Sequence, residues 1–171
     1  MRTTLYVISD LHLGGKPGTD GRPGFQICPP KTHGRLARFI NGLSGRAGRD
    51  DVRLIIAGDI VDFLAEEQFE AFTADPAAAR AKLKHILDST EPVWTALRDF
   101  VTRRDGALTL MLGNHDIELS LPGVRPQLLD RIGQGRVEFL YDNEALPTSN
   151  AIPLSAGDVR SRHSRKLNWR T

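Results

Sequence analysis

The sequence predicts an α/β fold with a mostly parallel sheet flanked by helices. Four short runs of apolar, β-branched and aromatic residues predict strands at 4–8, 52–57, 107–112 and 137–141. Segments with helical spacing separate these runs, and strands that alternate with helices pair in parallel through right-handed crossovers. The second and third strands are nearly all apolar, which is typical of a sheet covered on both faces.

Four helices are expected between the strands. Residues 33–43 place apolar side chains three and four positions apart, with glycines near the end of the segment. A second helix begins at Pro76, and Asp75 is its N-cap. Residues 91–104 and 127–132 supply the other two helices. These helices are the connections that a parallel sheet requires.

Composition limits the class of protein. The 171 residues suit one domain, and 40% hydrophobic with 26% charged residues is ordinary for a globular chain. No run approaches the roughly 18 apolar residues of a membrane span, and the single cysteine, Cys28, demands no oxidising compartment. A cytoplasmic location is therefore expected. The ordered domain is expected at 1–141, and 142–171 is predicted to be an irregular basic tail.

Side chains of the kind that bind metals follow each of the first three predicted strands. Because the carboxyl ends of parallel strands share one edge of a sheet, these side chains are expected to converge there. They are Asp10 and His12, then Asp59 and Asp62, then Asn114, His115 and Asp116.

The ligand types agree with one another. Carboxylates, an imidazole and an amide oxygen suit divalent ions such as Mn²⁺, Fe²⁺, Zn²⁺ or Co²⁺. Asp10 and His12 are two residues apart, so on an extended chain both side chains point to the same side. Gly58 and Gly113 precede the second and third clusters and allow a sharp turn and a close backbone approach.

Together the three clusters resemble the motifs of the calcineurin-like metallophosphoesterases. Those motifs are Asp-x-His, Gly-Asp-x-x-Asp and Gly-Asn-His-Asp/Glu, and the resemblance covers about residues 3–141. It implies that Asp10 and His12 are ligands of a first metal ion, that Asp59 bridges two ions, and that Asn114 is a ligand of the second.

The same resemblance implies a hydrolase, a phosphatase in the broad sense, that cleaves phosphomonoesters or phosphodiesters with two divalent ions. His115 resembles the family's catalytic histidine, which protonates or stabilises the leaving group. Asp116 is the expected orienting partner of His115, and Asp62 is expected to support the metal ligands from behind.

The family's later motifs, a further histidine and a Gly-His-x-His segment, have no counterpart in this sequence. His163 is the only histidine after His115, and it is not expected to be a ligand. The second metal site is therefore expected to be incomplete, as in a truncated or frameshifted N-terminal half of the family's four-layer sandwich. Without the second sheet, an exposed apolar face and self-association are expected.

Two other functions stay open at this point. The chain can be a non-catalytic binding module derived from the family, or a nuclease of the same superfamily, whose members also begin with Ser-Asp-x-His-Leu-Gly. A lipid-A-pathway pyrophosphohydrolase is disfavoured, because those enzymes typically have arginine at the position of His115. Nucleic acid is not the favoured partner, since a tail with only five basic residues is more often simply solvated.

Overall fold

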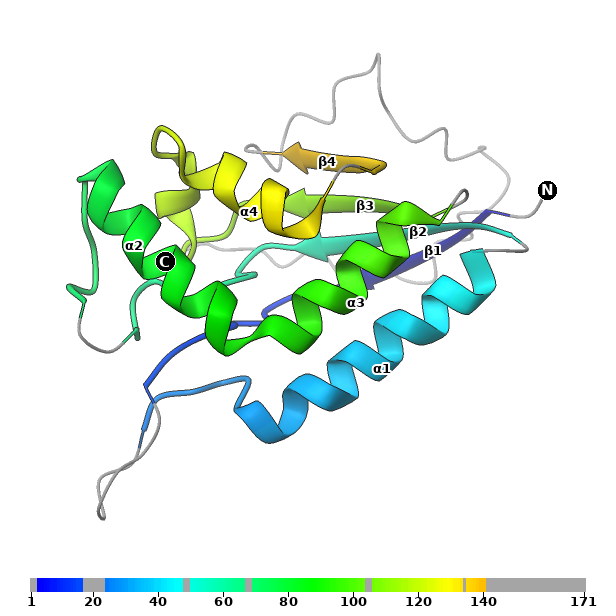
Figure 1. Ribbon diagram of the computed structural model, residues 1–171, viewed down its shortest axis with the longest axis horizontal. Coiled ribbons are helices and arrows are strands. Elements are labelled where there is room, and N and C mark those ends of the chain that lie inside the picture. The colour runs from blue at the N-terminus through cyan, green and yellow to red at the C-terminus, as the bar shows by residue number, and fades with distance from the viewer. Residues whose placement is uncertain are drawn as a thin grey trace, which may run out of the picture.

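The computed structural model describes residues 3–16, 24–47, 50–66, 69–103, 106–133 and 135–140. Strands and helices alternate along this part of the chain (Figure 1). The elements are β1 (Thr3–Ile8), α1 (Pro30–Ala47), β2 (Asp51–Ala57), α2 (Pro76–Ser89), α3 (Glu91–Thr102), β3 (Gly106–Met111), the 3-10 helix η1 (Ile117–Ser120), α4 (Val124–Ile132) and β4 (Val137–Leu140).

The four strands form one sheet in the order β1-β2-β3-β4, and every neighbouring pair is parallel. Tyr6 pairs with Leu54, and Leu54 in turn pairs with Leu108. This arrangement confirms the predicted α/β class with a parallel sheet, and each predicted strand lies within a residue or so of the observed one.

The helices lie on one face of this sheet. In Figure 1, α1, α3 and α4 all lie in front of the strands. Right-handed crossovers put every connecting helix on the same face when the chain always steps in the same direction across the sheet, as it does in the order β1 to β4. Leu54 and Trp94 are fully buried in the resulting core. Within the described residues no helix covers the opposite face, in agreement with the uncovered face expected when the second sheet is missing.

The opposite face carries the alternate residues of each strand. On β1, the side chains of Leu5 and Val7 are 40% and 59% exposed, although both are apolar. Val7 pairs with Ile55, and Ile55 pairs with Thr109, so these residues share that face. Their exposure agrees with the expectation of an apolar face.

The start of α2 agrees with the sequence prediction, whereas the bounds of α1 differ from it. Asp75 caps α2 as expected, since its carboxylate accepts hydrogen bonds from the backbone N–H groups of Ala77 and Ala78. In contrast, α1 begins before residue 33 and continues through Gly42 and Gly45 to Ala47. Burial of Leu43 and Ala47 against the core outweighs the weak helix propensity of the glycines.

Within the described ranges, no helix has the length and apolar character needed to cross a membrane. The predicted tail at 142–171, including His163, lies outside the described residues.

Candidate metal centre

The three segments with metal-type side chains are joined directly by backbone hydrogen bonds just beyond the strands. The His12 N–H donates to the carbonyl of Asp59 (2.8 Å), and the Asp62 N–H donates to the carbonyl of Leu13 (2.9 Å). The Phe63 N–H donates to the carbonyl of His115 (3.1 Å), which ties the second segment to the third. The structure thus brings the three segments to one edge of the sheet, as the sequence predicts.

Asp10, His12 and Asp59 form one potential metal site. Each offers a ligand atom, and these atoms all lie within 4.8 Å of one another. The Nε2 atom of His12 is 3.8 Å from a carboxylate oxygen of Asp59. Two carboxylates and one imidazole at this spacing have the chemistry that Mn²⁺, Fe²⁺, Zn²⁺ or Co²⁺ prefers, so the residues present fit a divalent ion.

The backbone of the same three residues is strained. Their φ angles are +56° for Asp10, +43° for His12 and +47° for Asp59. Residues other than glycine rarely adopt this left-handed region, and each such residue costs about 1–3 kcal/mol. The segment after β1 is therefore not extended, so the predicted reason for the convergence of Asp10 and His12 is wrong. A turn, rather than strand alternation, aims both side chains at Asp59.

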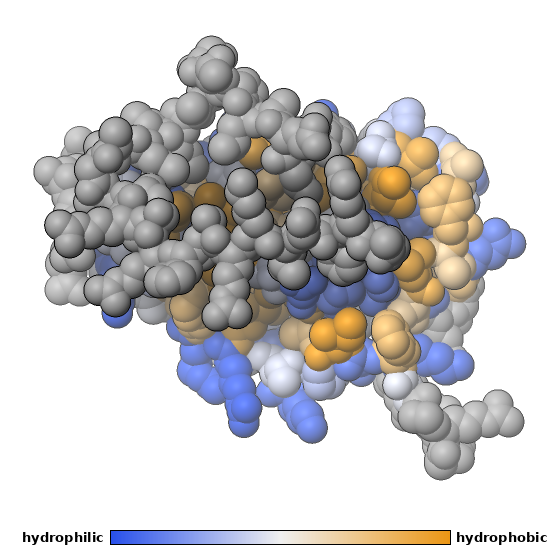
Figure 2. All heavy atoms as spheres, turned by 180° about the vertical axis from the view of Figure 1, so that it is seen from behind, coloured by the Kyte–Doolittle hydropathy of each residue, from blue (hydrophilic) through white to orange (hydrophobic). Residues whose placement is uncertain are grey.

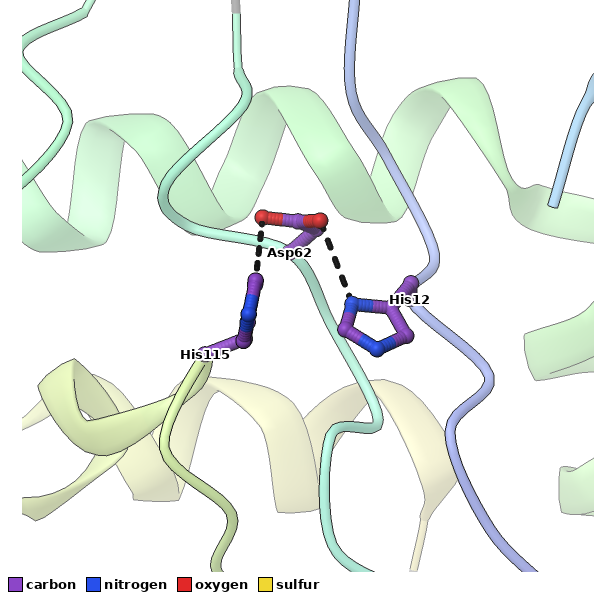
Figure 3. A group of neighbouring side chains, drawn as sticks. All are labelled: His12, Asp62 and His115. Carbon is purple, nitrogen blue, oxygen red and sulfur yellow. Dashed lines mark hydrogen bonds and ion pairs between the residues drawn. The ribbon is translucent and has the colours of Figure 1, made fainter. Parts of the chain in front are cut away.

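Asp62 lies between the two histidines of the site (Figure 3). One carboxylate oxygen is 3.2 Å from Nδ1 of His12, and the other is 3.3 Å from Nδ1 of His115. The backbone N–H groups of Leu64 and Ala65 donate to the latter oxygen, which holds the carboxylate in place. With Nδ1 bonded to Asp62, each histidine can turn its Nε2 atom towards a ligand.

The carboxylate of Asp116 has a different position from the one expected. It is buried, and it accepts hydrogen bonds from the backbone N–H groups of Ile60 (2.7 Å) and Gly113 (2.6 Å). Burial raises the pKa of Asp116 to about 6, against the opposing effect of these hydrogen bonds. The prediction that Asp116 orients His115 is therefore wrong. Asp62 lies beside the His115 ring, and Asp116 connects the second segment to the third.

Gly113 permits the closest backbone approach in the site. A Cβ atom at this position would lie 2.2 Å from a carboxylate oxygen of Asp59 and 2.3 Å from its backbone nitrogen. That carboxylate oxygen accepts the N–H of His115 (2.9 Å), so the approach orients Asp59. Asn114, the expected ligand of a second ion, is exposed at the turn between Gly113 and His115.

A buried glutamate that the sequence did not single out supports the segment after β1. Glu66 accepts the N–H of Gly15 (2.8 Å) with one carboxylate oxygen and pairs with Nδ1 of His85 through the other. The side chain of His85 itself is half-exposed on α2. Glu66 lies only four residues after Asp62, but nothing in the local sequence shows that it turns inward.

A buried lysine holds the segment that follows Asp62. Lys82 of α2 donates from Nζ to the carbonyls of Phe63 (3.0 Å) and Glu70 (2.5 Å) and to the carboxylate of Glu118 (3.1 Å). Burial raises the pKa of Glu118, against the opposing effect of the Lys82 ammonium. The sequence does contain a signal for this lysine, because it interrupts the apolar stripe of α2 beside Leu83.

Comparisons of this chain with family models, with curated proteins and with solved structures found no match.

Proposed function

We propose that the chain is a metal-dependent phosphoesterase of the calcineurin-like type, which hydrolyses phosphomonoesters or phosphodiesters. The observation that carries this proposal is the convergence of Asp10, His12 and Asp59 within 4.8 Å of one another. The three motifs belong to separate segments of the chain, and the backbone is strained at the residues whose side chains converge.

The chain's residues have separable roles in this proposal. Asp10, His12 and Asp59 would hold a first divalent ion, and Asp59 with Asn114 would contribute to a second. The ions, when bound, supply Lewis acidity towards the phosphoryl oxygens and lower the pKa of water. Asp62 fixes the orientation of His12, since it lies 3.2 Å from Nδ1 of that ring.

His115 acts on the leaving group. Its Nδ1 atom is held by Asp62 at 3.3 Å, which leaves Nε2 to donate a proton. In hydrolysis, the oxygen of water bonds to phosphorus, the P–O bond to the alcohol breaks, and the alcohol leaves with the proton from His115. One proton of the water stays on the phosphate product, and the other passes to solvent, from which His115 regains its proton.

Hydrolysis of bis-p-nitrophenyl phosphate in the presence of Mn²⁺ tests this proposal. The chain should release p-nitrophenol. With phenyl phosphate, whose poorer leaving group depends more on a proton, His115→Asn should lower kcat by about 10²- to 10⁴-fold while Mn²⁺ still binds. Asp88→Asn, at an exposed carboxylate of α2, is the matched control and should leave kcat unchanged. Mn²⁺ binding without any hydrolysis would instead support a non-catalytic module. If His115→Asn keeps both Mn²⁺ binding and full hydrolysis, the proposed role of His115 is overturned.

A further inference from the structure

Three large apolar side chains are exposed at the edge of the sheet that carries the candidate metal centre. They are Leu64 (38% exposed), Phe72 (58%) and Ile117 (46%). Figure 2 shows apolar residues gathered on the surface at this end of the molecule, on the right in that view. Exposed apolar residues that gather in one place commonly mark a binding surface, whereas isolated ones need no explanation.

Hydrogen bonds of these residues or of their neighbours, and proximity along the chain, connect them to the candidate site. The N–H of Leu64 donates to the Asp62 carboxylate oxygen that also lies beside His115. Ile117 is two residues after His115 and begins η1. Phe72 immediately precedes Thr73, whose N–H donates to Glu118, the neighbour of Ile117. The three residues therefore belong to the same connected set of loops as the proposed catalytic histidine.

The support beneath these residues is fixed by a buried charge. Lys82 donates to the carbonyl of Phe63, next to Leu64, and to the carbonyl of Ala71 (3.4 Å), next to Phe72. It also pairs with Glu118, next to Ile117. A buried ion pair holds such positions because breaking it leaves an uncompensated charge. The loops are thereby kept from folding their apolar side chains into the core.

We propose that Leu64, Phe72 and Ile117, here called the apolar rim, bind the organic part of a phosphate ester whose alcohol is alkyl or aryl. This inference rests on the proposed phosphoesterase activity, because the phosphate group would occupy the neighbouring metal centre. Contact with an apolar alcohol removes the rim from water, whereas a sugar or another polar alcohol would leave its own hydroxyl groups without partners there. The apolar rim therefore selects the substrate class.

Two diesters that share charge and leaving group test this selection directly. Octyl p-nitrophenyl phosphate should have a KM about 10-fold or more below that of methyl p-nitrophenyl phosphate with Mn²⁺ present, because its longer chain reaches the rim. The substitutions Leu64→Ser, Phe72→Ser and Ile117→Ser should each reduce this ratio about 3-fold or more. Phe39→Ser is the matched control, since Phe39 is exposed on α1 and packs on Tyr6 of β1; it should leave the ratio unchanged.

Binding of two phosphonates, which cannot be hydrolysed as esters, gives a readout that does not need turnover. Titration with octylphosphonate and methylphosphonate in the presence of Mn²⁺ should show the same preference, and the three serine variants should weaken it. Equal affinities, or a preference that survives all three substitutions, would overturn the apolar rim and leave the phosphoesterase proposal standing if the esters are hydrolysed. If no probe is bound and none is hydrolysed, both the apolar rim and the phosphoesterase proposal are overturned.

Discussion

At the scale of single residues, the candidate centre is built on unfavourable backbone angles. Asp10, His12 and Asp59 all have positive φ, a conformation in which their Cβ atoms crowd the backbone. Such angles persist only where neighbouring contacts impose them, and here the His12–Asp59 and Leu13–Ile60 backbone hydrogen bonds do so. Stability is therefore given up at the positions where the proposed ligands must converge.

Replacement of Asp10 separates this strain from the proposed ligand role. Asp10→Gly should raise the free energy of unfolding by up to about 1 kcal/mol in the absence of metal, because glycine adopts φ of +56° without steric cost. Asp10→Ala should not, since alanine keeps the Cβ atom. Both variants should lose Mn²⁺ affinity. Urea unfolding measures the first effect, and equal stability of the two variants would contradict the strain.

The sequence was sufficient to predict that these side chains converge but not which contacts each carboxylate makes. Asp62 and Asp116 are both near His115 in the predicted cluster, yet Asp62 bonds to the ring and Asp116 bonds to the backbone of Ile60 and Gly113. The choice depends on the Asp62–His115 and Ile60–Asp116 hydrogen bonds, which join residues more than 50 positions apart. Local patterns do not encode those bonds, and neither do they show that Glu66 reaches back to Gly15.

At the scale of elements, replacement of glycine by alanine is expected to have opposite effects on stability at two positions. Gly113→Ala should destabilise the fold by about 1–3 kcal/mol, because the new Cβ would collide with the backbone and carboxylate of Asp59. Gly42→Ala should stabilise it by about 0.5–1 kcal/mol, since no atom lies within 4 Å of that Cβ and alanine favours the helix α1. Thermal unfolding compares them, and a shift of the same sign in both would refute this account of Gly113.

The Lys82–Glu118 pair links α2 to η1 and to the segment that follows Asp62. Lys82→Met should lower the free energy of unfolding by about 3–5 kcal/mol, because the Glu118 carboxylate remains buried without its cation. Lys82→Met combined with Glu118→Leu should cost less than the sum of the single changes, since neither charge is left alone. A double-mutant cycle by urea unfolding measures this coupling, and additive costs would show that the pair does not act as a unit.

At the scale of the whole molecule, the order of the strands determines which face is covered. The apolar strands allowed a correct prediction of a parallel sheet, but they do not reveal whether the chain reverses its direction across that sheet. Because the order is β1-β2-β3-β4 without reversal, the helices lie together on one face. The other face presents Leu5 and Val7 to solvent, an arrangement that favours association.

We predict that two copies of the chain associate through this exposed face. Val7→Lys should weaken the association about 10-fold or more, because it places a charge in the contact. Phe39→Lys is the control and should not weaken it, because Phe39 is part of α1 and packs on Tyr6, on the helix side of the sheet. Sedimentation velocity over a range of concentrations measures the association constant. A chain that stays monomeric throughout, or equal effects of the two lysine variants, would rule out the sheet face as the contact.

The central claim is that the residues that follow β1 and β2 build one divalent metal site. Isothermal titration with Mn²⁺ tests it most directly, with Asp59→Asn as the key variant, because the amide oxygen of asparagine can still accept the His115 N–H that Asp59 accepts at 2.9 Å. The account predicts binding of at least one ion, an affinity loss of about 10-fold or more in Asp59→Asn, and no loss in Asp88→Asn. Absence of binding heat, or equal affinity in the chain and in Asp59→Asn, would contradict it.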